Sequence, residues 1–146
     1  MANVLSSLTG RRMTWRTERD EKDRTMPQTF DPATLAALHS TREVRIRTAR
    51  HRNRGVVIWI VAADDGVFVR SVRGPKGKWF VTAAADGQAT LEVGDQQFPV
   101  RVVPVADHAT IEAVSQAFLT KYATSPYAQS IVAPATLPTT LRLDPA

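Results

Sequence analysis

The chain has 146 residues, a length typical of one domain, and 43% of them are apolar, which suffices for a single hydrophobic core. It contains no cysteine, which excludes a disulfide framework, a thiolate zinc site and a thiol nucleophile, and fits a cytoplasmic location. No apolar run reaches the roughly 20 residues that a membrane-spanning helix requires, so we expect no membrane association. The residues before Arg11 are too few and too polar for a signal peptide.

Positive charge is concentrated in one part of the chain. The formal net charge is +5, from 19 basic and 14 acidic residues. Within the segment 42–78 the basic residues outnumber the acidic ones, which are Glu43, Asp64 and Asp65. Such a concentration indicates an anionic partner. The ten basic residues are Arg42, Arg45, Arg47, Arg50, Arg52, Arg54, Arg70, Arg73, Lys76 and Lys78.

The N-terminal part of the chain differs in composition from the rest. Residues 1–29 carry mixed charge and few apolar side chains, which predicts a disordered extension before a domain spanning 30–146. A first helix is predicted to begin at Asp31-Pro32, because aspartate is a good N-cap and proline suits the first helical position. It is expected to end at residues 39–41.

Three strands are predicted next. Residues 43–48 alternate strictly, with Val44, Ile46 and Thr48 on one face, which is typical of a half-buried strand. Residues 56–61 are apolar on both faces, which favours a central strand. The Asp64-Asp65-Gly66 turn then predicts a hairpin to a third strand, 67–71.

The remaining elements are two helices and three strands. A short helix is predicted over 78–85, and a hairpin joins 89–93 to 97–105 across Gly94-Asp95. Pro99 suggests that the second arm of this hairpin lies at an edge. Asp107 is expected to cap a longer amphipathic helix, and 139–143 to form a last strand on an open edge. Six short strands with flanking helices favour a mainly β fold, a small antiparallel barrel.

The strongest candidate site follows the third strand. Between Arg70 and Trp79 a strand ends, a glycine-rich cationic loop follows and a helix is expected to begin. Helix N-termini leave free N–H groups that bind phosphate, and arginine and lysine add charge. We therefore predict a phosphate-binding loop, with a solvated basic loop as the alternative. Its candidate ligands are Arg70, Ser71, Arg73, Gly74 and Lys78.

Other residues support fewer interpretations. The basic connection Arg50–Gly55 lies either at the rim of the barrel or in a flexible loop. The three histidines, His39, His51 and His108, are too far apart in sequence to suggest a metal site. Trp59 and Trp79 fit the core or a ring-stacking surface. No catalytic triad or carboxylate pair can be assembled, so any difficult chemistry would come from a cofactor.

At these residues the chain resembles the split-barrel flavin-binding proteins, which include pyridoxamine phosphate oxidases and deazaflavin-dependent nitroreductases, and more closely an uncharacterised bacterial branch of that group. The most specific stretch is WIV-x₅-VFVRSVRG-x₃-KW, within a resemblance that covers about residues 31–144. The resemblance implies a six-stranded antiparallel split β-barrel, usually a homodimer with FMN or a deazaflavin at the subunit interface.

The resemblance also suggests site residues. Thr48, Arg50 and Gly55 take places similar to a phosphate-contacting turn in the nitroreductases, although Ala49 replaces a glycine of that motif. Arg70 and Ser71 match strand-end positions that face phosphate. Gly74 and Trp79 match a stretch that leads into the short helix, which completes the predicted cofactor-binding set of Thr48, Arg50, Trp59, Arg70, Ser71, Arg73, Gly74, Lys78 and Trp79.

Two functions remain open from the sequence. The first is a flavin- or deazaflavin-binding redox protein that reduces or oxidises a small organic substrate. The alternative is a non-catalytic module for an anionic ligand such as single-stranded nucleic acid, which is disfavoured because few aromatic residues interleave with the basic ones. For either, Arg70→Glu is expected to abolish ligand binding and spare the fold, since an arginine at the rim need not be buried.

Overall fold

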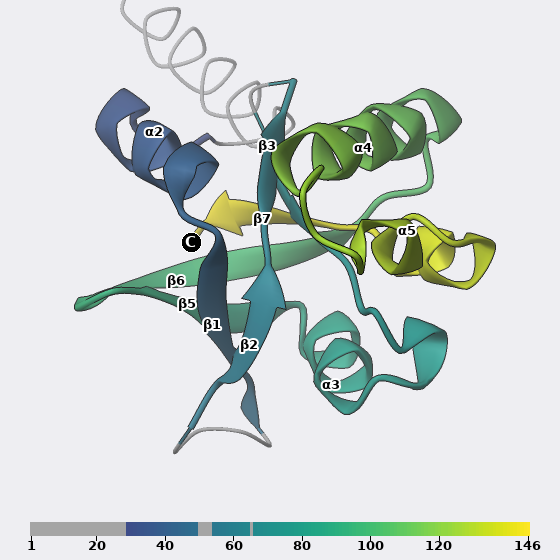
Figure 1. Ribbon diagram of the computed structural model, residues 1–146. Coiled ribbons are helices and arrows are strands. Elements are labelled where there is room, and N and C mark those ends of the chain that lie inside the picture. Colours follow the sequence, from purple (N-terminus) through teal and green to yellow (C-terminus); the bar gives the residue numbers. More distant parts are fainter. Residues whose placement is uncertain (1–28, 50–53, 65) are drawn as a thin grey trace, which may run out of the picture.

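The computed structural model describes residues 29–49, 54–64 and 66–146 (Figure 1). The predicted N-terminal extension, residues 1–29, therefore lies outside the described residues except for Thr29. Arg50 and His51 also lie outside them.

All strand pairings are antiparallel, in the order β2-β1-β5-β6-β7-β4-β3. β2 and β3 stand at opposite ends of this order, yet only Ile60 separates them in the chain. The sheet therefore curls until its two ends meet at Ile60, which makes a nearly closed barrel. The strands are β1 (Glu43–Arg47), β2 (Val56–Trp59), β3 (Val61–Ala63), β4 (Gly66–Val69), β5 (Gln88–Val93), β6 (Gln96–Pro104) and β7 (Leu141–Pro145).

The predicted antiparallel barrel with flanking helices is confirmed, and the strand count differs for a simple reason. The strand expected over 56–61 breaks at Ile60, where the chain leaves the partner of β2 and joins that of β3, so seven strands replace six. The central position expected for this strand is wrong, since its two halves form the ends of the sheet. Its apolar residues are explained instead by the barrel interior on one face and helix packing on the other.

Two other positions in the sheet differ from the prediction. β6 lies between β5 and β7, so Pro99 does not mark an edge. The proline is accommodated because the β6–β7 ladder begins at Val100, and the Pro99 carbonyl accepts the N–H of the last residue, Ala146, at 3.0 Å. β7 lies between β6 and β4 and is likewise internal.

The helices cover the barrel on separate sides. Asp31 caps α2 (Pro32–Ser40) by accepting the Thr34 N–H, and Asp107 caps α4 (His108–Lys121) by accepting the Thr110 N–H. α3 (Lys78–Asp86) ends at Gly87, whose φ of +73° suits a glycine. The short α5 (Ala128–Ile131) was not predicted.

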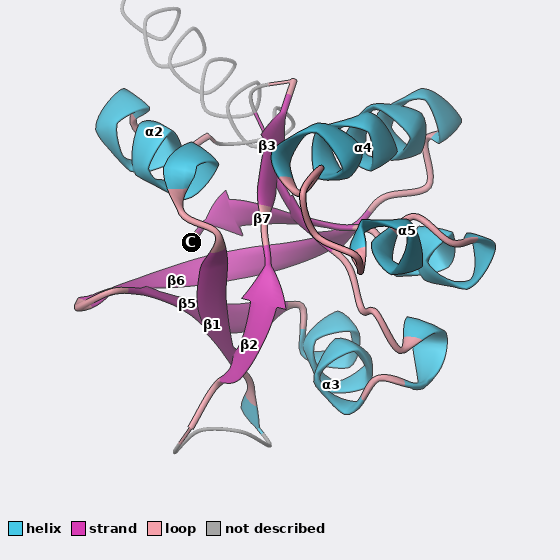
Figure 2. Cartoon of the chain, in the orientation of Figure 1, coloured by secondary structure: helices cyan, strands magenta, loops and turns pink. Residues whose placement is uncertain are grey.

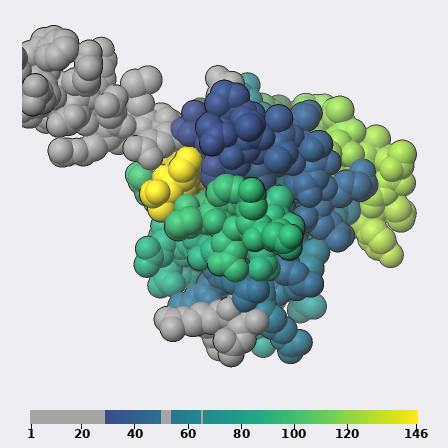
Figure 3. Space-filling model, turned by 90° about the vertical axis from the view of Figure 1, so that its left-hand side faces the viewer, coloured from purple at the N-terminus to yellow at the C-terminus, as the bar shows by residue number. Residues whose placement is uncertain are grey.

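Figure 2 shows α3, α4 and α5 together on one side of the sheet. Figure 3 shows another face, which is covered by the β5–β6 hairpin with α2 above it and the C-terminal residues beside it. No helix within the described ranges is both long and apolar enough to cross a membrane.

Two apolar clusters support this arrangement. One fills the barrel and includes Ile46, Ile60, Leu91 and Leu143, which are almost fully buried. The other packs β3 and β4 against α4 and α5 and includes Phe118. The chain passes from one cluster to the other at the break in the barrel wall, since Ile60 belongs to the first cluster and Val61 to the second.

Candidate functional site

A groove of about 550 Å³ runs along β2, opposite the loop that follows β4 and beside α5. Its volume lies within the range of small-molecule pockets, and its walls combine apolar side chains with a few polar ones. It is lined by Glu43, Val56, Val57, Ile58, Trp59, Arg70, Ser71, Val72, Arg73, Gly77, Lys78, Trp79, Tyr127, Ser130 and Ile131. Most of the residues predicted from the loop after the third strand thus meet at one groove.

One end of the groove is the N-terminus of α3. The N-cap residue, Gly77, has no side chain to cap the helix, and its own N–H donates to the Gly74 carbonyl. The first helical hydrogen bond runs from the Val81 N–H to the Gly77 carbonyl, at 3.0 Å. The N–H groups of the three residues before Val81 therefore have no hydrogen-bond partner in the described part of the chain, and the helix dipole at this end favours an anion.

Ser71 lies directly beside this helix end. Its side chain is buried, 1% exposed, and its Oγ has no hydrogen-bond partner among the described residues. A Cβ on Gly77 would lie 2.2 Å from that oxygen, which is a clash, so any residue other than glycine would force the Ser71 side chain to shift. An unpaired buried hydroxyl is unfavourable by about 1–3 kcal/mol, and a ligand oxygen at the groove would pair it.

Arg70 lies at the groove but is buried, which corrects the expectation of an exposed rim residue. Only 2% of it is exposed, and its guanidinium donates to the Thr140 and Ser115 hydroxyls, each at 2.9 Å. It also donates to the carbonyls of Ile111 at 2.9 Å and Ile131 at 3.3 Å. Four of its five N–H groups thus bind the protein itself, so the predicted neutrality of Arg70→Glu for the fold is wrong.

No carboxylate forms an ion pair with Arg70 within the described part of the chain. Burial lowers the pKa of its guanidinium to about 10, and the charge of Glu112 partly opposes that shift. The ring centre of Phe118 lies 5.6 Å from the guanidinium carbon and adds a cation–π contact. Arg70 therefore provides a buried positive charge behind the groove.

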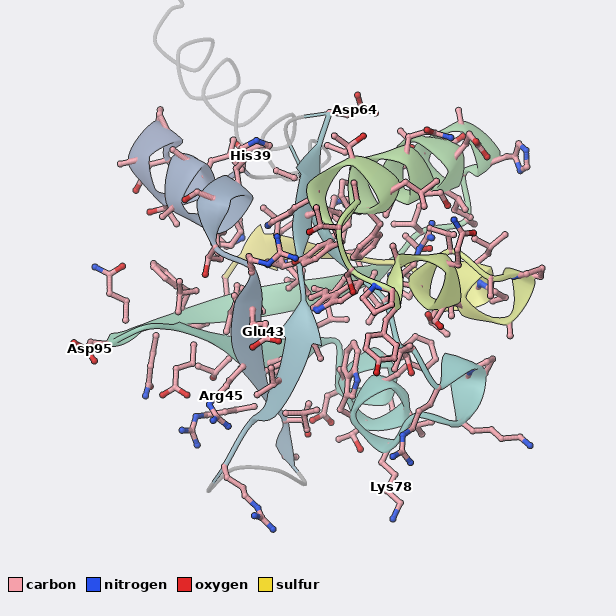
Figure 4. The ribbon with its side chains drawn as sticks, viewed as in Figure 1. His39, Glu43, Arg45, Asp64, Lys78 and Asp95 are labelled. Atoms are coloured by element: carbon pink, nitrogen blue, oxygen red, sulfur yellow. The ribbon has the colours of Figure 1, made fainter. Side chains whose placement is uncertain are left out.

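The other predicted cations lie at the rim. Arg73 and Lys78 line the groove with exposed side chains, and Figure 4 shows the Lys78 side chain extending outward from α3. Gly74 does not line the groove. It is buried with a φ of +73°, and a Cβ there would lie 3.2 Å from the Ala135 carbonyl oxygen, so its role is in the turn.

The two tryptophans form the aromatic walls. Trp59 is half-buried at the end of β2, and its ring stacks on that of Tyr122 with centres 4.0 Å apart and planes 3° apart. Trp79 is buried at the start of α3 and meets Phe80 edge-on at 6.3 Å. Both rings belong to the packing and to the groove, so the two interpretations of the sequence do not exclude one another.

The remaining predicted ligands are not brought to the groove. Thr48 is buried at the end of β1 and does not line it, and Arg50 lies outside the described residues. The described ranges hold no group of three histidine or acidic side chains arranged for a metal ion.

Several lining residues were not predicted. Ser130 and Ile131 come from α5 and Tyr127 is its N-cap residue, and this helix is too short to leave a periodic signal in the sequence. Glu43 lies opposite Trp59 in the β1–β2 register, so correct strand pairing could have placed it there. Gly77 directly precedes the helix predicted over 78–85, so its position as the N-cap of α3 agrees with the predicted helix start.

The fold and the groove together define a class: a small antiparallel barrel, nearly closed, with a groove along β2 and a helix N-terminus at that groove. The chain belongs to the family described as an uncharacterized protein conserved in bacteria (DUF2255), whose model matches residues 34–143. No curated protein matches the sequence.

Proposed function

We propose that the groove binds the phosphate-bearing tail and the ring of FMN or a deazaflavin, and that the protein uses it to reduce or oxidise a small organic substrate. The observation that carries this proposal is the unpaired, buried Ser71 hydroxyl beside the free N-terminus of α3. Both features are unfavourable in the free protein, and both would be satisfied by one phosphate group.

The charges around this point support the same ligand. Arg73 and Lys78 stand at the rim, and the Arg70 charge lies behind the wall. Together with the helix end they would attract an anion from solution and hold it against the loop. The residues that would hold the phosphate are therefore Ser71, Gly77, Lys78 and Arg73, with Arg70 acting mainly through its charge.

The rest of the groove suits a flat, largely apolar ring. Trp59 and Trp79 offer aromatic surfaces, and Ile58 and Val56 add aliphatic contacts from β2. When bound, a flavin-type cofactor would supply the hydride or electron transfer. The chain's own residues would orient the ring, keep water from one of its faces and hold the phosphate.

The resemblance to split-barrel flavin proteins further suggests a homodimer. The rim of the groove carries exposed apolar side chains, Val57, Val72 and Tyr127, with 47%, 60% and 68% of each exposed. A second subunit would cover such a rim and narrow the groove. Light scattering of the purified protein measures whether the mass is that of one chain or two.

The nucleic-acid alternative has less support. Single-strand binding proteins present aromatic rings on an open, basic surface, where successive bases stack. Here Trp59 is already stacked on Tyr122, and Trp59 and Trp79 line a concave groove. We therefore propose the small-molecule cofactor and not a nucleic acid.

A fluorescence titration tests whether the groove binds a phosphate-bearing flavin or deazaflavin. Purified protein is titrated with FMN, a deazaflavin and riboflavin, which lacks the phosphate, while the quenching of ligand fluorescence is followed. We expect micromolar or tighter binding of FMN or the deazaflavin and at least about tenfold weaker binding of riboflavin, the equivalent of one charge-assisted hydrogen bond. Absence of binding by both phosphate-bearing ligands would remove the proposal.

Two controls sharpen the experiment. Gly77→Ala is compatible with the backbone, since φ at Gly77 is −59°, but its methyl group would clash with the Ser71 hydroxyl and displace it, so FMN affinity should fall toward that of riboflavin. An oligonucleotide titrated at two salt concentrations tests the alternative, because phosphate contacts by Lys and Arg weaken steeply as salt rises.

A further inference from the structure

The break between β2 and β3 leaves backbone groups that the sheet cannot satisfy. At Ile60 the chain leaves the β1 ladder and has not yet entered the β4 ladder, and Ile60 is fully buried. Buried backbone N–H and C=O groups without partners are strongly unfavourable. A side chain from elsewhere must therefore bind them.

Two consecutive residues at the end of α4 do so. The Tyr122 hydroxyl accepts the Ile60 N–H at 3.2 Å and donates to the Arg42 carbonyl at 2.5 Å. The Lys121 ammonium donates to the Ile60 carbonyl at 2.7 Å and to the Leu38 carbonyl at 3.1 Å. Tyr122 and Lys121 thus join β1, the strand break and the end of α2. Figure 1 shows α4 beside β3 at this seam.

The same tyrosine also contacts the groove wall. Its ring stacks on Trp59, the last residue of β2, with the ring centres 4.0 Å apart. The Arg42 guanidinium carbon lies 5.0 Å from the centre of the Tyr122 ring. Since Tyr122 is fully buried and bonded at its hydroxyl, its ring is fixed, and the indole stacked on it is fixed with it.

We infer that Tyr122 and Lys121 are positioning residues, which hold Trp59 as the aromatic wall of the groove by binding the backbone at Ile60. The identity of the ligand in this inference rests on the proposed function, whereas the placement of Trp59 does not depend on it. It follows that the groove has two halves, each held in place by different residues. The phosphate half depends on Ser71 and α3, and the ring half depends on this seam.

The first experiment needs no ligand. Replacing Trp15 and Trp79 by phenylalanine leaves Trp59 as the single tryptophan of the chain, whose quenching by acrylamide reports its exposure. We expect Tyr122→Leu to raise the quenching constant most, and Tyr122→Phe, which keeps the ring but not the hydroxyl, to raise it less. A quenching constant unchanged in both variants would overturn the inference.

Variants of Lys121 test whether a conservative substitution preserves the position of Trp59. Lys121→Arg retains donors for the two carbonyls and should leave the quenching constant near that of the parent, whereas Lys121→Met should raise it. Lys76→Met is the matched control, because Lys76 is exposed and does not line the groove. An equal response in Lys121→Met and Lys76→Met would contradict the role of Lys121.

The second experiment compares FMN with inorganic phosphate in otherwise native protein. Tyr122→Leu should weaken FMN binding about fivefold, the loss expected for one aromatic stacking contact, and leave phosphate affinity unchanged. An equal loss for both ligands would indicate general loosening and would overturn the division into halves. If the native protein binds neither, the proposed function fails, while the quenching experiment still decides on the position of Trp59. Circular dichroism verifies that each variant is folded.

Discussion

Ser71 combines complete burial with an unpaired hydroxyl, an arrangement that folded proteins rarely keep without a reason. Its backbone N–H is satisfied by the Thr139 hydroxyl at 3.0 Å, so only the side chain lacks a partner. An alanine at this position would pack equally well in the free protein. The hydroxyl is therefore best explained by a ligand.

Ser71→Ala should stabilise the free protein and weaken binding of phosphate-bearing ligands. Removal of an unpaired buried hydroxyl should raise the free energy of unfolding by about 1 kcal/mol, and loss of its bond to an anion should lower affinity about tenfold. Urea denaturation and the FMN titration measure the two effects. Ser130→Ala is the control, since Ser130 lines the groove but is exposed. A destabilised Ser71→Ala protein would show that the hydroxyl is paired.

Arg70 illustrates the opposite case, a charged residue whose contacts are mostly internal. It connects the residue before β7, Thr140, with α4 through Ser115 and Ile111 and with α5 through Ile131. It thereby holds the helix that forms one wall of the groove.

Arg70→Met should destabilise the fold by about 3 kcal/mol or more, because it removes four hydrogen bonds that a buried charged group makes to the protein. Arg73→Met, a change of the same kind at an exposed neighbour, should alter the free energy of unfolding by less than about 0.5 kcal/mol. Chemical denaturation of both variants measures the difference. Similar stability of the two proteins would contradict the structural role of Arg70.

At the scale of elements, the strand break brings an ammonium group into a partly buried position. Burial and, to a smaller extent, the nearby Arg42 charge together lower the pKa of Lys121 from its ordinary 10.5 to about 8. Tyr122 responds oppositely, since burial raises the pKa of its phenol above 10.0, so it affects stability only above pH 10. Glu43 and Arg42 are the charged groups that influence this tyrosine.

Between about pH 8 and pH 10 the unfolded chain binds more protons at Lys121 than the folded chain does. The free energy of unfolding should therefore rise with pH across this window. Below pH 8 the buried Lys121 ammonium should lower the free energy of unfolding by its full amount. Lys121→Met should remove that part of the slope. Denaturation at pH 7.5, 8.5 and 9.5 measures it in both proteins, and identical slopes would show that Lys121 is fully solvated.

At the scale of the whole molecule, the C-terminal strand joins the two parts of the barrel. β7 pairs with β6 on one side and with β4 on the other, so the last residues complete a wall begun at residue 43. The stability of the barrel should therefore depend strongly on side chains from β7.

Leu143→Ala should lower the free energy of unfolding by about 2–5 kcal/mol, as for other buried leucines, because its side chain lies in the barrel interior. Val81→Ala is the matched control, since Val81 is 50% exposed on α3 and its loss should change stability by less than about 0.5 kcal/mol. Thermal or urea unfolding compares them. A small effect at Leu143 would mean that β7 is dispensable.

The local elements could be predicted from the sequence because their signals are local. Strict alternation over 43–48, the aspartate caps of α2 and α4, and the turn at Gly94 act within a few residues of the chain. The positions of the strands in the sheet could not be predicted from the sequence, because the order of strands depends on contacts between segments that are distant in the chain. Pro99 and the last strand show this, because the local pattern predicts an edge position for each, whereas contacts with distant strands place both inside the sheet.

The sequence by itself determined that this chain forms an antiparallel barrel, and that a cationic, glycine-containing loop leads into a helix beside it. Only the tertiary structure decided which of those cations face a ligand. Arg70 and Arg73 are alike in sequence, but Arg70 is enclosed by acceptors from α4, α5 and Thr140, whereas Arg73 is exposed. Burial and pairing of a side chain depend on segments that lie 40 to 70 residues away, and a local pattern contains no information about them.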